Sequence, residues 1–412
     1  MRFLLSFFYK FYMWTSKKLI IGYLKVRSLL DRLRNPKKKK VIVESSYNGQ
    51  PIMLMALYEK GVLRNDTQAL LQAAKCLGIY VVGVNTKKLD WQDSYAALLD
   101  CYIERDNFGR DFGSYKLGFD HLYSKGWDKE CPRLLMINDS VFFSSKYCRT
   151  FLESLFKSPV EVLGATENHE IEHHLGSFCI AMSGRVLRSE KLKSYWNNYK
   201  NSDIRPEVIE RGEMGLSKCL KSAVGRDDGF RALYDAAYVA QYIDENPDIV
   251  VKLDRLSRKS KLTGWPVFSW EDALKSSFYL KNSLVKELGD EYYFDVEDWG
   301  DVEGLIPKHQ EYINEERFLG ELKEKAVAYF IHCFNSGSQL HANNIFLHYI
   351  GVPIIKLDGL YRGMFNVEDI ENLASQLEVS QKEEFRRLMY SRPFGQDVLF
   401  GWKRLAFMLG YI

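Results

Sequence analysis

"PRLLMINDSVFF", residues 132–143, is the stretch that decides the fold of this chain. Four apolar residues, Leu134 to Ile137, end abruptly in Asn138, Asp139 and Ser140. A continuous apolar run with polar residues at its end is typical of a strand buried on both faces. The run therefore predicts a strand that delivers an amide and a carboxylate to the edge of a sheet.

The segments before this strand alternate between two patterns. Apolar runs at 41–47 (VIVESSY), 79–86 (IYVVGVNT) and 94–106 (SYAALLDCYIERD) predict strands, whereas 50–62 (QPIMLMALYEKGV) and 115–127 (YKLGFDHLYSKGW) predict helices. Strands that alternate with helices favour an α/β fold with a mainly parallel sheet, in which ligands bind beyond the carboxyl ends of the strands.

The composition bounds the class of protein. A chain of 412 residues exceeds one small core and predicts two domains, or one large domain with an addition. Hydrophobic residues make up 46% and aromatic residues 14%, which argues for a globular protein and against a disordered one. The net charge of +3 gives no whole-protein case for nucleic-acid binding.

The cysteines indicate the compartment. The seven are scattered along the chain, with no CxxC pair and no metal-like spacing to histidine. An odd count of such cysteines, without a secretory signal, predicts reduced thiols in the cytosol.

The first forty residues mix aromatic and aliphatic residues with basic ones. Five charges leave no apolar run near the roughly 18 residues needed to span a bilayer; they are Lys10, Lys17, Lys18, Lys25 and Arg27. An aromatic, basic helix followed by Lys37 to Lys40 suits the interface of an anionic membrane. The alternative is a helix packed on the protein's own body.

The loop "ERDNFGRDFGSY", residues 104–115, lies between a predicted strand and a predicted helix. Gly109 and Gly113 allow a turn that brings the backbone close to a ligand. The spacing matches neither the dinucleotide fingerprint nor the lysine-containing phosphate loop. The alternative is a charged turn in which Arg110 pairs locally with Asp106 or Asp111.

The NDS tip predicts a second chemical feature. Mg²⁺ or Mn²⁺ bound to a diphosphate needs only one or two oxygen ligands from the protein, so Asp139 and Asn138 suffice as metal ligands. The alternative is a strand cap, because Asn and Asp commonly end strands in turns.

Five blocks resemble, in order, those of the rhamnan synthesis protein F family, which is associated with bacterial polysaccharide biosynthesis. The blocks are RDNFGRDFGSYKLGF (105–119), LLMINDSVFF (134–143), HHLGSFCIAMSGRVLRSEKLKSYW (173–196), EMGLSKCL (213–220) and HANNIFLHYIGVPIIK (341–356). The resemblance spans roughly residues 41–365. It implies a GT-A-like glycosyltransferase domain at 41–260, completed by 261–365, with a helix at 1–40 and a helical tail at 366–412.

The resemblance also implies which residues bind the nucleotide-sugar donor. The donor loop corresponds to Asn107, Gly109, Arg110 and Asp111. The metal motif corresponds to Asp139 with Asn138, although this chain has NDS where the usual motif is DxD. His341 and Asn344 correspond to a block near the donor phosphates, and they also fit helix caps.

The acceptor and the catalytic base are implied further along the chain. His173, His174 and Ser177 correspond to the edge of a groove for the acceptor sugar. A zinc site is another interpretation of the histidine run, which includes His169, but the nearby sequence offers no fourth ligand. An inverting transferase needs a carboxylate base, for which Glu213 is the first candidate and Glu210 the second. A helix N-terminal carboxylate is the alternative reading of Glu213.

Two functions of different classes remain from the sequence. The first is a glycosyltransferase, peripheral at the inner face of the cytoplasmic membrane. It would extend a lipid-linked cell-surface polysaccharide, such as lipopolysaccharide or capsule, with rhamnose as the sugar that the family suggests. The second is a non-catalytic member that binds nucleotide sugar or glycan within an assembly complex. They differ in whether Glu213, Asp139 and the loop at 107–111 face one cleft.

Overall fold

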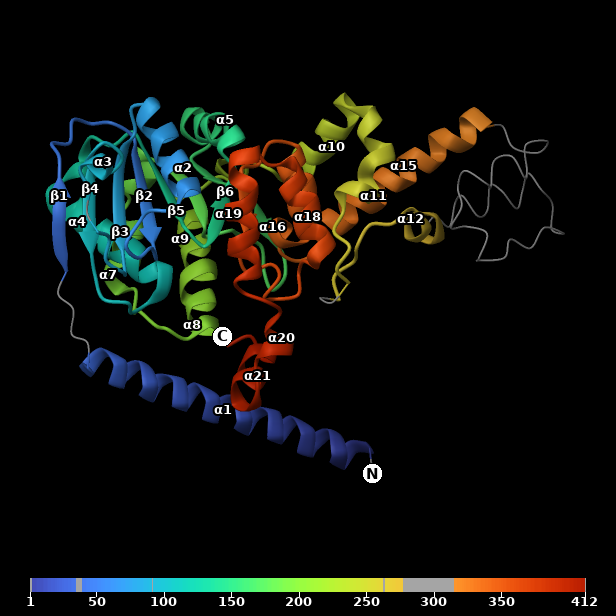
Figure 1. Cartoon of the computed structure of the whole chain (residues 1–412), viewed down its shortest axis with the longest axis horizontal. Coiled ribbons are helices and arrows are strands. Elements are labelled where there is room, and N and C mark those ends of the chain that lie inside the picture. The colour runs from blue at the N-terminus through green and yellow to red at the C-terminus, as the bar shows by residue number, and fades with distance from the viewer. Residues whose placement is uncertain (1, 35–38, 91, 262–263, 277–314, 412) are drawn as a thin grey trace.

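The computed structural model describes residues 2–34, 39–90, 92–261, 264–276 and 315–411. An eight-stranded sheet forms the centre of the molecule (Figure 1). Its strands, in spatial order, are β1 (Lys40–Glu44), β4 (Cys101–Glu104), β3 (Tyr80–Asn85), β2 (Ile52–Leu57), β5 (Arg133–Asn138), β10 (Cys179–Ser183), β7 (Val162–Gly164) and β11 (Phe230–Ala232). Two small sheets pair β6 (Val141–Phe143) with β12 (Ile354–Lys356), and β8 (Glu167–Asn168) with β9 (His174–Leu175).

The direction of the strands confirms the predicted α/β fold with a mixed, mainly parallel sheet. Strands β4, β3, β2 and β5 run parallel, as do β7 and β11, while β1 and β10 are antiparallel to their neighbours. The chain passes from β2 outward to β3 and β4, and then returns to β5 on the other side of β2. The strand order therefore reverses between β2 and β5, the position at which such sheets bind ligands.

Helices cover both faces of the sheet. One face packs against α2 (Asn65–Cys76), α5 (Ser145–Lys157), α10 (Ala236–Glu245), α15 (Glu315–Phe334), α17 (Asn344–Tyr349), α18 (Val367–Gln376) and α19 (Val379–Tyr390). The other packs against α4 (Arg110–Lys125), α7 (Glu190–Asn198), α8 (Arg205–Val208) and α9 (Gly215–Val224). Shorter helices are α3 (Asp93–Ala96), α6 (Gly184–Leu187), α11 (Leu253–Leu256), α12 (Trp270–Ser276), α16 (Gln339–Ala342), α20 (Gly395–Val398) and α21 (Gly401–Met408).

The helix predicted at 50–62 is wrong, because this segment contains strand β2. All six of its residues are buried. Met53 and Met55 enter one hydrophobic core and Leu54 enters the other, as expected for side chains that alternate across a strand. The strands expected at 79–86 and 132–143 and the helix at 115–127 are confirmed by β3, β5 and α4.

The carboxyl-terminal part of the chain shares the core of the sheet. Strand β12 pairs with β6, and Ile370 and Phe385 pack in the same cluster as Met53. The segment from 366 is therefore not a simple tail, because α18 and α19 bury apolar side chains in the main body. The part of 261–365 that spans 262–263 and 277–314 lies outside the described residues.

The predicted amino-terminal helix is α1 (Arg2–Arg34), which runs beneath the body and touches α21 (Figure 1). Ile20 is buried with Ala406 and Tyr411. The opposite face carries Leu19, Val26, Leu29 and Leu33, each more than half exposed. Their spacing of seven, three and four residues places them on one face of the helix. Among the described residues, no helix is both long enough and apolar enough to cross a bilayer.

Candidate functional site

The loop between β4 and α4 is organised by Arg105. This side chain is only 5% exposed, and burial lowers its pKa to about 10. Its guanidinium donates to the carbonyls of Asp106 (2.7 Å), Phe108 (2.6 Å) and Arg110 (2.6 Å), and to Oγ of Ser114 (2.9 Å). The sequence predicts local pairing only for Arg110, and no motif marks this role of Arg105.

The backbone of the loop is left-handed at two consecutive residues. Gly109 has φ = 92° and Arg110 has φ = 51°, and a residue other than glycine takes this conformation only at a cost of about 1 kcal/mol or more. The Gly109 N–H donates to Oδ1 of Asp203 at 2.7 Å, so Asp203 already occupies a backbone amide of the predicted donor loop. Arg110 also turns toward Asp203, with Nε donating to its carbonyl at 3.0 Å.

Gly113 leaves no room for a side chain. A Cβ at this position would lie 2.5 Å from the Phe108 carbonyl oxygen and 2.9 Å from an Arg105 nitrogen. We expect Gly113→Ala to destabilise the protein by about 1–3 kcal/mol, because neither the backbone nor the hydrogen-bonded guanidinium can move freely. Urea unfolding measures this change. Gly22→Ala, where a Cβ meets nothing within 4 Å, is the control, and equal stability of the two variants would contradict the packing argument.

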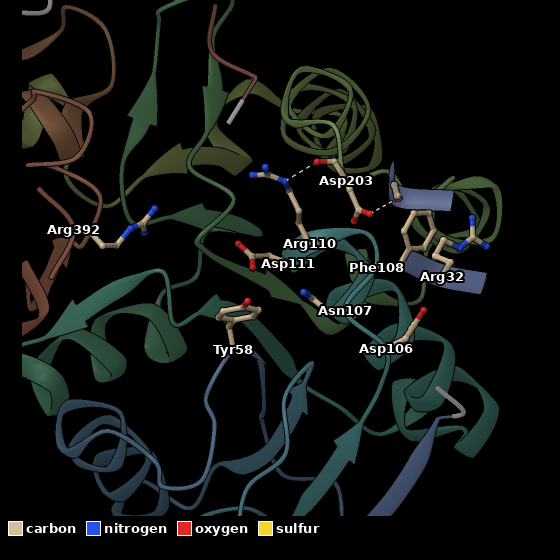
Figure 2. Close-up of a pocket in the computed structure, with 10 residues that line it drawn as sticks. Arg32, Tyr58, Asp106, Asn107, Phe108, Arg110, Asp111, Asp203 and Arg392 are labelled. Carbon is tan, nitrogen blue, oxygen red and sulfur yellow. Dashed lines mark hydrogen bonds between the residues drawn. The ribbon is translucent and has the colours of Figure 1, made fainter. Parts of the chain in front are cut away.

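A pocket of about 810 Å³ opens at the reversal of strand order. It is lined by Ser28, Arg32, Tyr58, Asp106, Asn107, Phe108, Arg110, Asp111, Asp203 and Arg392. Asn107, Arg110 and Asp111 of the predicted donor loop therefore line it, whereas Gly109 lies behind. Figure 2 shows the Asp111 carboxylate pointing into the space between Arg110, Tyr58 and Arg392.

Asp111 connects the pocket to the tip of β5. Its Oδ2 accepts a hydrogen bond from Nδ2 of Asn138 at 3.0 Å. Burial raises the pKa of Asp111, while the charges of Lys356 and Arg110 oppose this shift. Lys356 is the last residue of β12, so the carboxyl-terminal part of the chain adds positive charge beside the site.

The predicted metal ligands, Asn138 and Asp139, already have hydrogen-bond partners within the protein. Asn138 directs its oxygen to Ser140, from which it accepts at 2.6 Å from Oγ and at 3.2 Å from N–H, so its amide hydrogens face Asp111. Asp139 is 7% exposed and does not line the pocket, and its Oδ2 accepts from the Tyr58 N–H at 2.5 Å. Burial, with the Glu59 charge, raises the pKa of Asp139 to about 8. The Asn138 side-chain oxygen and one of the two Asp139 carboxylate oxygens thus have partners within the protein, and these residues join the ends of β2, β5 and α4.

Glu213 lies on a π-helical turn, Ile209–Met214, between α8 and α9. Single π-helical turns within helices are frequent at functional sites. Its Oε2 lies 3.6 Å from Nε2 of the buried His174, whose Nδ1 donates to the Glu172 carbonyl at 2.8 Å. Burial lowers the pKa of His174, but Glu213 and the carbonyl raise it by more. The Glu213 charge also raises the pKa of Asp111, which places it near the pocket although it does not line it. Glu210 is exposed and less suited to act as a base.

The other residues predicted to contact the acceptor do not share the partner of His174. His173 and His169 both face Glu167, at 2.8 Å and 3.2 Å, while His174 turns to Glu213. The histidine run is therefore not a three-histidine site. The Ser177 carbonyl accepts from the Tyr115 hydroxyl at 3.2 Å, which fixes this backbone.

The two residues predicted near the donor phosphates have other partners. Asn344 is 1% exposed, donates to the Ile354 carbonyl and accepts from the Lys356 N–H, so it holds β12 and is not open to a ligand. His341 contacts Asp358 at 3.1 Å and Ser338 at 3.0 Å. Burial lowers the pKa of His341, while Asp358 opposes this shift. Both assignments to phosphate are thus disfavoured by the geometry.

The central segment of the chain matches one known family. Residues 81–249 match the family described as rhamnan synthesis protein F. The predicted resemblance to the rhamnan synthesis protein F family is therefore confirmed over these residues. The match contains the loop, the tip of β5 and the π-helical turn, but not α1 or the segment from 341.

Curated relatives match shorter parts of the chain. The virulence protein VirA of Vibrio anguillarum is 28% identical over 121 residues, which cover 28% of this chain and 38% of VirA. The uncharacterized protein y4gN of Sinorhizobium fredii is 25% identical over 171 residues, which cover 40% of this chain and 44% of y4gN. The chain thus spans less than half the length of the curated relatives it matches.

A solved structure also shows a likeness. The crystal structure of the glycosyltransferase GlyE from Streptococcus pneumoniae matches 68% of this chain and 64% of that one, at 10% identity and a TM-score of 0.27. An overlap this loose establishes neither a common arrangement of the site nor a common activity.

Proposed function

We propose that this protein is a glycosyltransferase of the GT-A type that moves a sugar from a nucleoside diphosphate sugar to a growing bacterial polysaccharide. The observation that supports this most is the pocket at the reversal of strand order, whose wall is the loop shared with the rhamnan synthesis protein F family. Ligands of open α/β sheets bind at this position. The family name makes rhamnose the first sugar to test.

The residues of the pocket suit the parts of such a donor. The Tyr58 ring is 55% exposed and offers a face for a nucleobase or a sugar. The Arg110 guanidinium is suited to phosphate oxygens, and the Asp111 carboxylate can accept from a ribose or sugar hydroxyl. These three side chains face one space in Figure 2.

Glu213 is the proposed general base of an inverting reaction. A sugar hydroxyl attacks well only when a carboxylate takes its proton during the attack. Glu213 is 30% exposed, so an acceptor can reach it, and Nε2 of the buried His174 lies 3.6 Å from its carboxylate. The Glu213 charge raises the pKa of Asp111, which is expected if the donor and the acceptor bind at one site.

The acceptor is proposed to be a lipid-linked glycan at the inner face of the cytoplasmic membrane. The face of α1 that carries Leu19, Val26 and Leu33 has no partner within the described residues, and α1 is also basic. The same helix contributes Ser28 and Arg32 to the wall of the pocket. A membrane bound by this face would therefore lie beside the pocket and could present an acceptor to it.

Changing the outward face of α1 should release the protein from membranes. We expect Leu19→Glu combined with Leu33→Glu to abolish most sedimentation with anionic liposomes, because two charges would enter the apolar interface. Binding of the unchanged protein should weaken with salt, since part of the attraction is electrostatic. Val379→Glu, at an 86% exposed position on α19, is the matched control. Undiminished sedimentation of the double variant would place the membrane contact elsewhere.

The proposed activity is tested by product formation. The full chain is incubated with a panel of nucleotide sugars and with lipid-linked or synthetic glycan acceptors, and the products are identified by mass. We expect one donor to add a single sugar residue to an acceptor. Binding of a nucleotide sugar or glycan without transfer to any acceptor would instead support a non-catalytic component of an assembly complex.

A further inference from the structure

Three arginines from distant parts of the sequence line the pocket. Arg32 comes from α1, Arg110 from the start of α4, and Arg392 from the segment after α19. Among the residues that the structure describes, none of the three forms an ion pair with a carboxylate. Their partners are neutral, because Arg110 donates to a carbonyl while Arg32 and Arg392 lie 4.1 Å and 4.9 Å from the ring centres of Phe108 and Tyr361.

The aspartates of the pocket are engaged elsewhere. Both oxygens of Asp203 accept from neutral donors, Gly109 N–H at 2.7 Å and Ser28 Oγ at 2.5 Å. Asp106 lies 3.9 Å from the guanidinium of Arg105, behind the loop. Asp111 accepts from Asn138. The charges of Asp111 and Asp203 act on Arg110, but among the described residues neither forms an ion pair with Arg110 or Arg392, so the terminal N–H groups of both guanidiniums are left for a ligand.

Two of these three arginines point into the pocket. Figure 2 shows Arg110 and Arg392 on opposite sides of the pocket, with their guanidinium groups directed into the same space, whereas Arg32 lies beyond Phe108. A guanidinium binds phosphate oxygens with two parallel N–H groups and keeps its charge at every physiological pH. A diphosphate carries enough oxygens to be held by both groups at once.

We infer that Arg110 and Arg392 hold the diphosphate of the ligand directly, without a divalent cation. The inference rests on the proposed function and adds how the donor is bound. It fits the NDS sequence, in which the Asn138 oxygen and one Asp139 oxygen have partners within the protein, because the arginines supply the positive charge that a metal would otherwise bring. The same charges would stabilise the diphosphate as it leaves the sugar.

The inference also assigns a role to the carboxyl-terminal segment. Arg392 lies outside the residues that match the family, 81–249. The ligand would thus bridge the sheet domain and the segment after α19, and the complete site would need both. Lys356 strengthens the positive charge on the same side, since its ammonium acts on Asp111 and rests 4.7 Å from the Phe178 ring centre.

The test is calorimetric binding of inorganic pyrophosphate and of the common nucleoside diphosphates to the full chain, first with EDTA and then with Mg²⁺ or Mn²⁺. We expect the Kd to be the same under both conditions. Arg392→Ala and Arg110→Ala should each weaken binding by about tenfold or more, the usual effect of losing hydrogen bonds to a charged group. Arg392→Lys should fall between, because it keeps the charge and loses the paired donors.

Controls separate this inference from the proposed function. Both arginines are exposed, so the variants should unfold at the wild-type temperature, and Arg149→Ala on the surface of α5 should bind like the wild type. Binding that requires Mg²⁺ or Mn²⁺, or that is unaffected in Arg392→Ala, overturns the inference alone. The absence of binding to any nucleoside diphosphate under either condition overturns the proposed function with it.

Discussion

Glu213→Gln is expected to lower the turnover of sugar transfer by about a hundredfold or more, the usual contribution of a positioned general base. Glutamine keeps the shape of the side chain and can still contact His174, 3.6 Å away in the wild type, but it cannot accept the proton of the acceptor hydroxyl. The affinity for the donor should not change, because Glu213 does not line the pocket. Steady-state kinetics and donor titration measure the two quantities separately.

Glu210→Gln provides the comparison on the same π-helical turn. Glu210 is exposed, whereas the Glu213 carboxylate lies 3.6 Å from a buried histidine, His174. Near-normal turnover in Glu213→Gln would remove it as the base. Loss of turnover in Glu210→Gln would then move the role to that residue, and normal turnover in both would favour a retaining reaction.

The second large effect is expected at Arg105, which acts through the loop and does not line the pocket. Arg105→Ala removes the donor that satisfies the carbonyls of Asp106, Phe108 and Arg110. Because Arg105→Ala removes three hydrogen bonds from a charged group to part-buried carbonyls, the free energy of unfolding should fall by at least about 3 kcal/mol. The left-handed backbone at Arg110 would lose its support, so binding of nucleoside diphosphates should become undetectable at concentrations that saturate the wild type.

Arg133→Ala is the control that separates the effect of the loop on binding from a general loss of stability. Arg133 is also a buried arginine, and it donates to the carbonyls of Leu155 and Val160 at the opposite end of β5. This variant should lose stability and keep its affinity for nucleoside diphosphates. If Arg105→Ala, measured at a temperature where it is folded, binds like Arg133→Ala, the loop does not position the pocket.

The sequence predicted correctly those strands whose apolar run is continuous and ends in polar residues. It did not predict β2, whose apolar run lies beside a turn. IYVVGVNT and LLMIN are continuous apolar runs that end in polar residues, and both form strands. QPIMLMALYEKGV contains good helix formers, but all six residues of β2 are buried, and five of them, Ile52 to Ala56, pair with both β3 and β5. Tertiary pairing of this kind outweighs local propensity and cannot be seen in one segment alone.

The candidate site was predicted in part for a similar reason. Asn107, Arg110 and Asp111 line the pocket, since a loop after a parallel strand lies at the ligand-binding edge. Arg32, Tyr58, Asp203 and Arg392 come from four other places in the sequence, and no local motif marks them. Which of two arginines in the loop faces inward depends on backbone angles, with Arg105 buried and Arg110 exposed.

The most direct test of the account is to find where a nucleoside diphosphate binds. A photoreactive azido-nucleoside diphosphate is cross-linked to the full chain, and the labelled peptides are identified by mass spectrometry. The account predicts labelling of the peptide that contains Asn107 to Asp111 or of the one that contains Tyr58, with competition by the unmodified nucleotide. A second groove lies beside Lys191, Tyr195 and Arg211. The account would be contradicted if the unmodified nucleotide competed only with labelling in this groove and the first pocket were not labelled.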